Sequence, residues 1–415
     1  MNALSGSKIL TFLRREFWQR HLPHGLISWR YLWPGQSRQV RLHRHFWWHA
    51  PTALPRPLWL IQQSWLYLRW IVWLGWRASW RTVKQHGPAV QAATGLSQFA
   101  QWRYALRLAL GRCLPPRMIY QYQLYLPQRQ PWDYVSEHET GAFHRWRDAC
   151  QLPASAPANK PLNKQSNKQA SREMLADKWQ CSQTLASAGI AVATTYCMLP
   201  RNSPAPDWDR FALPLFLKPR YGSAGQDCFY VYAGKNGAAD WQVYGQPASA
   251  RLSPRQQWQR ASRQQDYLIQ PCVANASALA TLASVAITLR VLTKRSEDNV
   301  VVDFACLEIP LQAQQHRMQP IDLASGALLA SGVSGPTDSA LATVWQHAAL
   351  ANLPHWQQAL RSAMLAHQML AGDLYSVAWD FVLSEAGALL LEGNSSWRLH
   401  ALQAERGGLL NENRK

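Results

Sequence analysis

The pattern of apolar and polar positions in the first 150 residues is typical of helices. The most apolar stretch, residues 58–76, still contains two glutamines and an arginine. On a helical wheel, the polar residues of this stretch and its continuation fall within an arc of roughly 120°. They are Gln62, Gln63, Arg69, Arg77, Arg81 and Lys84. We therefore predict a mainly helical N-terminal region that includes a helix with a cationic stripe.

After residue 172 the pattern changes to a mixture of helices and strands. Strand-like apolar runs occur at 190–199, 213–218, 228–232, 267–273, 285–293 and 300–308. Helical spacing occurs at 174–189 and 355–370, and a hairpin is predicted over 375–392 with its turn at 385–387. Because the strands do not alternate regularly with helices, the fold class is predicted to be α+β.

Residues 151–172 separate the two patterns and are rich in Pro, Ala, Ser, Asn, Gln and Lys. This composition is typical of a flexible linker or an exposed loop. We therefore predict four parts of the chain. They are a helical basic region at 1–150, a linker at 151–172, an α+β domain at 173–400 and a C-terminal tail at 401–415.

The basic charge of the chain is concentrated in its N-terminal third. The net charge is +19, and residues 1–130 contribute 18 Lys and Arg against a single acid, Glu16. Eleven of the 22 Trp lie in residues 1–80. A basic region of this kind attracts anionic partners, either phospholipid headgroups or nucleic acid.

Residues 58–76 are nearly long enough to cross a bilayer, which takes about 20 residues. However, Arg69 would be costly at the centre of a membrane. Three interpretations remain open: a helix that lies in the membrane interface, a buried helix of a folded domain, and a transmembrane span. In the first case, the segment 58–84 binds an anionic membrane surface.

The seven cysteines lie far apart and form no CxxC pair and no Cys/His cluster with zinc spacing. The 13 histidines give only a weak indication of metal binding, and residues 1–20 do not resemble a signal peptide. We therefore expect a reduced, cytoplasmic protein. If the segment 58–84 binds the membrane, the protein would be peripheral at its inner face.

A glycine-containing loop follows the strand-like run that delivers Lys218. The loop contains Gly222, Ser223 and Gly225. Glycines let backbone N–H groups turn toward an anion, and the lysine adds a positive charge. The loop is not a Walker A sequence, which requires GK[ST] at the start of a helix. It is a candidate phosphate-binding loop, and an ordinary hairpin turn is the alternative.

The predicted C-terminal hairpin carries two carboxylates and an amide. Asp380 lies on its first strand, and Glu392 and Asn394 lie on its second. Residues two apart on a strand point to the same side, so Glu392 and Asn394 point together, and pairing can bring Asp380 beside them. Carboxylate and amide oxygens suit magnesium better than zinc. A surface acid beside a turn is the alternative.

Two further basic residues are candidates for anion binding. Arg290 lies in the apolar strand ITLRVLTKR, where its charge needs an anionic partner. A phosphate or acyl-phosphate oxygen is one such partner, and a structural salt bridge is the alternative. Lys178 lies early in a predicted helix, where a solvated lysine is the alternative.

The order DK…GIAV…LFLKPRYGSAG…YLIQPCV…ITLRVLTKR…VAWDFVL…LLLEGN resembles the ATP-grasp superfamily. The greatest similarity is to the sugar-transfer-associated ATP-grasp group, over residues 173–397. The resemblance implies two α+β subdomains that clasp ATP. It also implies an ATP- and Mg²⁺-dependent enzyme that joins a carboxylate to an amine through an acyl-phosphate, with a sugar-linked or polysaccharide substrate.

The resemblance assigns roles to the candidate residues. Lys178 and Lys218 would contact the ATP phosphates, and the loop with Gly222, Ser223 and Gly225 would fold over them. Ile269, Gln270 and Cys272 would lie by the adenine, Arg290 would hold the transferred phosphate or the acyl-phosphate, and Asp380, Glu392 and Asn394 would carry magnesium.

The sequence departs from the family pattern in two places. A glutamate is common at the adenine hinge, and here Gln270 or Asp266 must serve. The segment 312–331 lacks the expected Asn- and Gly-rich turn, which puts the acceptor pocket in doubt.

Two other functions compete with the ligase. An ATP-grasp kinase would use the same lysines and magnesium. A basic nucleic-acid- or membrane-binding protein with a degenerate nucleotide domain is the second. Nucleic acid is not expected as a partner, because no RRM, KH or helix-turn-helix signature is present.

Overall fold

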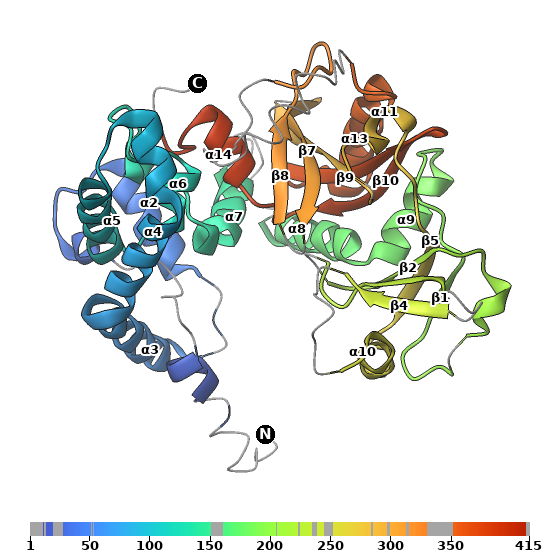
Figure 1. Ribbon diagram of the computed structural model, residues 1–415, viewed down its shortest axis with the longest axis horizontal. Helices are drawn as coiled ribbons and strands as arrows, with labels where there is room; N and C mark the ends of the chain where they lie inside the picture. Colours follow the sequence, from blue (N-terminus) through green and yellow to red (C-terminus); the bar gives the residue numbers. More distant parts are fainter. Residues whose placement is uncertain are drawn as a thin grey trace. The chain divides into compact units, whose positions relative to one another are not determined.

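The computed structural model of the protein describes residues 11, 14–19, 28–50, 52, 54–150, 161–204, 206–222, 225–234, 239–244, 252–283, 285–296, 299–312, 315–329 and 352–411 (Figure 1). The chain divides into two compact units. The described residues of the first unit lie within 1–150 and 398–415, and those of the second lie within 151–332 and 344–397.

The described part of the first unit is helical, as the sequence predicted. Its helices are η1 (Arg14–Gln19), η2 (Trp29–Leu32), α2 (Arg38–Trp48), α3 (Arg56–Arg69), η3 (Trp70–Leu74), α4 (Gly75–Thr94), α5 (Gln98–Arg112), α6 (Arg117–Gln121), η4 (Pro131–Asp133), η5 (Glu137–Glu139), α7 (Thr140–Cys150) and α14 (His400–Arg406). Helices α3, η3 and α4 follow one another without an intervening loop (Figure 1). None of the helices in the described ranges has the length and apolar character that a membrane crossing requires.

Local signals at the helix ends explain several of these boundaries. The hydroxyl of Ser37 accepts a hydrogen bond from the backbone N–H of Val40 at the start of α2, and Ser97 does the same for Ala100 in α5. Helix α4 ends at Gly95, whose φ of 74° is the left-handed conformation that favours glycine.

A buried charged cluster lies inside the first unit. The guanidinium of Arg112 contacts His43 (2.8 Å) and donates to the carbonyl of Tyr134 (2.9 Å), while His43 lies 2.7 Å from the carboxylate of Glu139. Burial works to raise the pKa of Glu139, but His43 and Arg112 outweigh it and hold that pKa below its usual value. Each charge therefore has a partner, which buried ions require.

The structure corrects two of the predicted boundaries. Half of the predicted linker 151–172 is helical, because α8 begins at Pro161 and continues to Ala176. The predicted tail 401–415 contains α14, which belongs to the first unit. There the amide of Gln403, which is fully buried, accepts from the backbone N–H of Val135 (2.7 Å) and donates to its carbonyl (2.8 Å).

The second unit contains two five-stranded antiparallel sheets, which confirms the predicted α+β class. The first sheet has the order β1-β5-β2-β3-β4 and the second has the order β10-β9-β6-β7-β8. The strands are β1 (Cys197–Leu199), β2 (Leu215–Pro219), β3 (Phe229–Ala233), β4 (Ala239–Val243), β5 (Tyr267–Pro271), β6 (Thr288–Ser296), β7 (Asn299–Gln312), β8 (Gln315–Pro320), β9 (Ser376–Ser384) and β10 (Gly387–Asn394).

Helices cover one face of each sheet. The other helices of this unit are α8 (Pro161–Ala176), α9 (Lys178–Ser187), η6 (Trp208–Arg210), α10 (Pro254–Ala261), α11 (Ser277–Ala280) and α13 (Trp356–Ala371). Trp258 of α10 packs into the core of the first sheet with Leu217 and Ile269. Ala359 and Ala363 of α13 pack into the core of the second sheet. The opposite faces remain available to position polar side chains.

A neutral histidine is built into the second sheet and its covering helix. The ring of His367 is fully buried, with Nδ1 2.7 Å from the hydroxyl of Thr293 and Nε2 3.2 Å from the carbonyl of Leu374. Because a carbonyl only accepts, Nε2 carries the proton and Nδ1 accepts from Thr293. Burial lowers the pKa of His367 to about 4.

This histidine predicts a loss of stability in mild acid. Between about pH 6.5 and pH 4 the unfolded chain binds a proton at His367 that the folded chain does not, so stability falls as pH falls through this range. The expected loss for this site is up to about 3 kcal/mol. Urea unfolding of the wild type and of His367→Gln across this range tests the prediction. The exposed His49→Gln serves as control, and equal acid sensitivity of all three proteins would contradict it.

Candidate functional site

The helix-free face of the first sheet carries two of the predicted residues. Phe216 pairs with Gln270, and Lys218 pairs with Leu268. Directly paired residues on neighbouring strands point to the same side, so Phe216, Lys218 and Gln270 share this face. Phe216 also pairs with Tyr230 on β3. This aromatic and amide surface was not foreseen from the sequence, because it depends on strand register.

The predicted hinge residues on β5 and just after it already have partners. The side chain of Ile269 is fully buried on the opposite face, and its carbonyl accepts from the backbone N–H of Tyr196 (2.8 Å). The amide of Gln270 donates to the hydroxyl of Thr195 (2.8 Å). The backbone N–H of Cys272 donates to the carbonyl of Pro214 (3.0 Å). An adenine ring at this position would therefore contact mainly the side chain of Gln270 and its aromatic neighbours.

Two lysines converge on Glu392 from the first sheet and from α9. Lys218 is 7% exposed, and its Nζ donates to the carbonyl of Leu391 (3.3 Å). Burial lowers the pKa of Lys218, while the nearby carboxylate of Glu392 opposes that shift. Lys178 opens α9, and its Nζ lies 3.8 Å from Glu392 and contacts the carbonyl of Gly222. Both lysines thus lie where the two sheets of the unit meet.

The base of the glycine loop is held by a charged cluster that the sequence did not suggest. Asp177, the N-cap of α9, accepts from the guanidinium of Arg220 (2.6 and 2.9 Å) and from the hydroxyl of Tyr221 (2.8 Å). Arg220 also contacts Asp266 (3.4 Å), so this alternative hinge acid is already paired. The cluster joins the start of α9 to the loop.

The loop itself requires glycine for two separate reasons. Gly222 has a φ of 140° and Gly225 a φ of 67°. A Cβ at Gly225 would also lie 2.5 Å from the ring of Tyr244. The predicted loop residue Ser223 lies outside the described residues. The ring of Tyr244 packs against Phe216 and Tyr230 of the first sheet, and burial raises its pKa.

We expect Gly225→Ala to destabilise the protein more than a glycine substitution without a clash. Gly189 has a φ of 78° and open space around its position, so Gly189→Ala isolates the backbone strain, about 1–2 kcal/mol. Gly225→Ala adds overlap with Tyr244, which costs about 1–3 kcal/mol more. Chemical denaturation of both variants measures the difference. Equal destabilisation would show that the Tyr244 ring moves aside freely.

The second sheet brings the predicted acidic residues together. Glu392 pairs directly with Asp380 across β10 and β9, as the hairpin prediction required, and a bulge lies between Leu390 and Glu392. The amide nitrogen of Asn394 donates to Asp380 Oδ2 (3.1 Å) and to Glu392 Oε1 (3.1 Å). Two carboxylates and one amide therefore meet at a single point.

Arg290 is held by two carboxylates of the same sheet. Its Nε and Nη2 donate to the two oxygens of Asp380 (2.8 and 2.9 Å), and its Nη1 forms an ion pair with Glu308. Burial works to lower the pKa of Arg290, but Asp380 and Glu308 outweigh it and raise that pKa. Arg290 therefore forms the salt bridge that was one of the two interpretations open from the sequence.

Burial dominates the electrostatics of Asp380. Burial raises the pKa of Asp380 to about 6, against the opposing effect of Arg290, and the neighbouring Glu308 and Glu392 add to the rise. Negative charge is therefore crowded around Asp380, and a cation would relieve it. Among the described residues, no group of three or more His, Cys, Asp or Glu side chains is arranged as a metal site. The predicted magnesium set differs in kind, because it has two carboxylates and an amide.

The sequence profile of the sugar-transfer-associated ATP-grasp family matches residues 158–415. The chain belongs to this family. Two antiparallel sheets with polar residues on their helix-free faces are thus the two subdomains of an ATP-grasp fold, which confirms the predicted fold. Membership also supports an ATP-dependent enzyme.

Three solved structures that match the chain are remote in sequence. An L-amino acid ligase from Bacillus licheniformis is 12% identical with a TM-score of 0.31, and the match covers 55% of this chain and 41% of the ligase. A D-alanine–D-alanine ligase from Bacillus anthracis with ATP is 9% identical with a TM-score of 0.35, and the match covers 58% of this chain and 65% of the ligase. A biotin carboxylase from Campylobacter jejuni is 14% identical with a TM-score of 0.36, and the match covers 57% of this chain and 44% of the carboxylase. The chain thus spans less than two thirds of each. No curated protein matches the sequence.

The candidate site also contains a residue that sequence reasoning missed. Glu308 on β7 contacts Arg290, and its side chain is 18% exposed. The signal that could have found it is the one that drew attention to Arg290, an isolated charge in an apolar strand, here CLEIP. Two opposite charges on adjacent predicted strands are candidates for a pair.

Proposed function

We propose that this ATP-grasp protein is a carboxylate–amine ligase that works through an acyl-phosphate. The observation that carries the proposal is the arrangement around Glu392. Lys178 lies 3.8 Å from it, Lys218 donates to the carbonyl of the preceding Leu391, and Asp380 and Asn394 lie beside it on the sheet. Such a site suits a nucleoside triphosphate with magnesium, because the cationic groups can bind the phosphates and the clustered oxygens can bind the metal ion.

We propose Asp380, Glu392 and Asn394 as the magnesium ligands. The fit rests on Asn394, whose amide nitrogen lies 3.1 Å from an oxygen of each carboxylate and so occupies the point where their charges converge. A rotation of this amide by 180° would present its oxygen instead, and the two orientations have nearly the same shape. Bound magnesium would neutralise phosphate charge as it builds up during transfer.

In the proposed reaction, a substrate carboxylate oxygen attacks the γ-phosphorus of ATP. A P–O bond forms, the bond to the bridging oxygen breaks, and ADP leaves. An amine then attacks the acyl carbon and loses a proton, and inorganic phosphate leaves as the amide forms. Lys178 and Lys218 would hold the ATP phosphates, and the loop with Gly222, Ser223 and Gly225 would cover them.

We assign Arg290 a positioning role in place of the predicted direct contact with phosphate. Its guanidinium fixes both oxygens of Asp380 and also binds Glu308. Those contacts orient Asp380 toward Glu392. They leave the guanidinium little capacity to hold an acyl-phosphate unless one carboxylate is released.

We further propose a sugar-linked or polysaccharide substrate, in keeping with the family to which the chain belongs. The carboxylate would belong to a uronic acid or an amino acid, and the amine to the other partner. The reaction would take place in the cytoplasm, where ATP is available, at the inner face of the membrane.

The test is a screen of uronic acids and amino acids as carboxylates, with amino sugars and amino acids as amines. ADP release would be followed with ATP and Mg²⁺, and the products would be identified by mass spectrometry. A product whose mass equals the two substrates minus water supports the ligase. A stable phosphorylated product with a hydroxyl acceptor would instead establish an ATP-grasp kinase, and no nucleotide binding by a folded sample would overturn both.

A further inference from the structure

The outer face of α3, η3 and α4 is apolar and open to solvent. Ile61 is 59% exposed, Val72 66%, Trp73 61% and Trp80 60%, and Leu68 is also exposed. Soluble proteins seldom leave so many large apolar side chains uncovered along one surface, and such patches mark interaction sites. We call this surface the tryptophan face, defined by Ile61, Leu68, Val72, Trp73, Trp76 and Trp80.

The orientation of α3 at its two glutamines is the reverse of what the polar arc suggested. Gln62 and Gln63 are both 1% exposed, although both lie on the polar side of the predicted wheel. The amide of Gln62 donates to the carboxylate of Glu16 (2.9 Å), and the buried Trp70 donates to the carbonyl of Ala109 (2.7 Å). These buried hydrogen bonds fix the rotation of the helices, so the apolar side chains are held outward.

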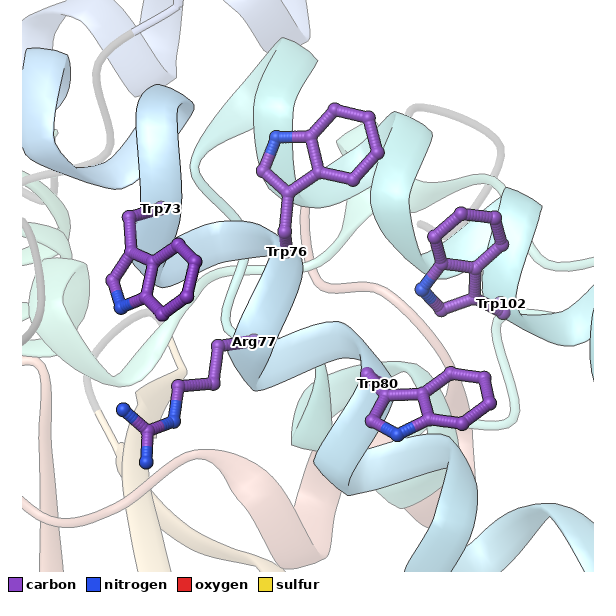
Figure 2. Close-up of a pocket in the computed structure, with 5 residues that line it drawn as sticks. All are labelled: Trp73, Trp76, Arg77, Trp80 and Trp102. Carbon is purple, nitrogen blue, oxygen red and sulfur yellow. The ribbon is translucent and has the colours of Figure 1, made fainter.

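A groove runs along the C-terminal part of the tryptophan face. It has a volume of about 550 Å³ and is lined by Trp73, Trp76, Arg77, Trp80 and Trp102. Figure 2 shows the indoles of Trp76, Trp80 and Trp102 around one side and the guanidinium of Arg77 beside Trp73. Aromatic walls with an arginine at the rim suit a ligand that has both an apolar part and an anionic part.

The charge around the groove selects an anionic partner. Arg77, Arg81 and Lys84 are exposed along α4. The single acid among residues 1–130, Glu16, is buried. A second copy of the chain would bring the same positive surface against this one, which is unfavourable. Nucleic acid would match the charge, but it has no apolar region that could bury aliphatic side chains such as Ile61, Leu68 and Val72.

We propose that the tryptophan face docks on an anionic phospholipid bilayer. The helices would lie in the plane of the interface, with the aliphatic side chains and indoles among the upper acyl chains and headgroups. Arg77, Arg81 and Lys84 would contact the phosphates. This proposal goes beyond the proposed reaction and does not depend on it, because none of these residues belongs to the ATP-grasp site.

The test is flotation of the full-length protein with vesicles. Binding is expected to vesicles of phosphatidylcholine with phosphatidylglycerol, and to be at least tenfold weaker with phosphatidylcholine alone. Trp73→Ala/Trp80→Ala is expected to weaken binding at least tenfold. The matched control is Trp29→Ala/Trp33→Ala, which removes two tryptophans of similar exposure from η2 and the residue after it, and it is expected to bind as the wild type does.

A second variant separates charge from apolar insertion. Arg77→Gln/Arg81→Gln/Lys84→Gln is expected to lose about fivefold in affinity for each charge, with the loss largest at low salt. Thermal stabilisation by ATP and magnesium, retained in every variant, would show that the fold and the ATP site are intact. The proposal is overturned if anionic vesicles do not bind, if the control variant weakens as much as Trp73→Ala/Trp80→Ala, or if the latter changes only self-association or RNA binding.

Discussion

Glu392→Gln is expected to lower ADP release by about a thousandfold, because the charge stabilisation that a metal ion supplies is worth several kcal/mol. The same variant is expected to lose the additional thermal stabilisation that magnesium gives over ATP alone. Its fold is expected to survive, since Glu392 is 26% exposed and has no arginine partner among the described residues. Gln keeps the size of the side chain and removes the charge.

Asp380→Asn provides the matched comparison on the opposite strand. It is expected to lose activity to a similar extent and also to destabilise the protein by about 3–5 kcal/mol, because a buried arginine would lose its bidentate partner. Arg290 would retain only Glu308. The two variants thus separate the proposed metal role, which they share, from the structural role, which belongs to Asp380 alone.

The control for both variants is Asp303→Asn on β7. Asp303 is another carboxylate of the same sheet, and it pairs with Lys294 (2.7 Å) away from the three proposed ligands. We expect near-normal activity from it. If Glu392→Gln retains its response to magnesium, or if Asp303→Asn loses as much activity as Glu392→Gln, the proposed magnesium set is wrong.

The parts of this site that could be predicted from the sequence depend on local geometry. Glu392 and Asn394 are two residues apart on one strand, so alternation was enough to place them on one side. The contact with Asp380 needs more, because the pairing that starts at the turn would set Asp380 opposite Leu391, and the bulge between Leu390 and Glu392 shifts it to Glu392. The glycine loop could also be predicted, because its residues are contiguous.

The parts that could not be predicted depend on the exact register between paired strands. Arg290 and Glu308 meet because β6 pairs with β7 through a bulge between Leu292 and Thr293. A bulge shifts the register of the two strands by one residue, and the composition of these strands does not predict it. The binding partner of Arg290 was for this reason left open between a phosphate and a salt bridge.

The predicted limits and orientation of the helices were wrong for a different reason, because tertiary packing decides them. Residues 161–172 are polar, and helix propensity alone gives such a segment little stability in water. In the structure α8 contributes Leu175 to the core of the second unit. Similarly, Gln62 and Gln63 were assigned to a cationic stripe, yet both are buried, and Gln62 donates to Glu16 inside the first unit. Periodicity identifies the two sides of a helix but does not decide which side faces the core.

Lys218→Met is expected to reduce turnover by about 10²–10³-fold, the usual effect of removing one preorganised group that stabilises developing charge. Burial lowers the pKa of Lys218, which means that the folded protein holds the charged form less well than water does. Without ATP, the apolar methionine is therefore not expected to lower the free energy of unfolding, whereas ATP is expected to stabilise the variant much less than the wild type. Lys294→Met, which removes a lysine paired with Asp303, serves as control and is expected to bind ATP normally. A lysine kept for packing would give the opposite pattern, with stability lost and ATP binding retained, so the two measurements together decide what the buried charge of Lys218 is for.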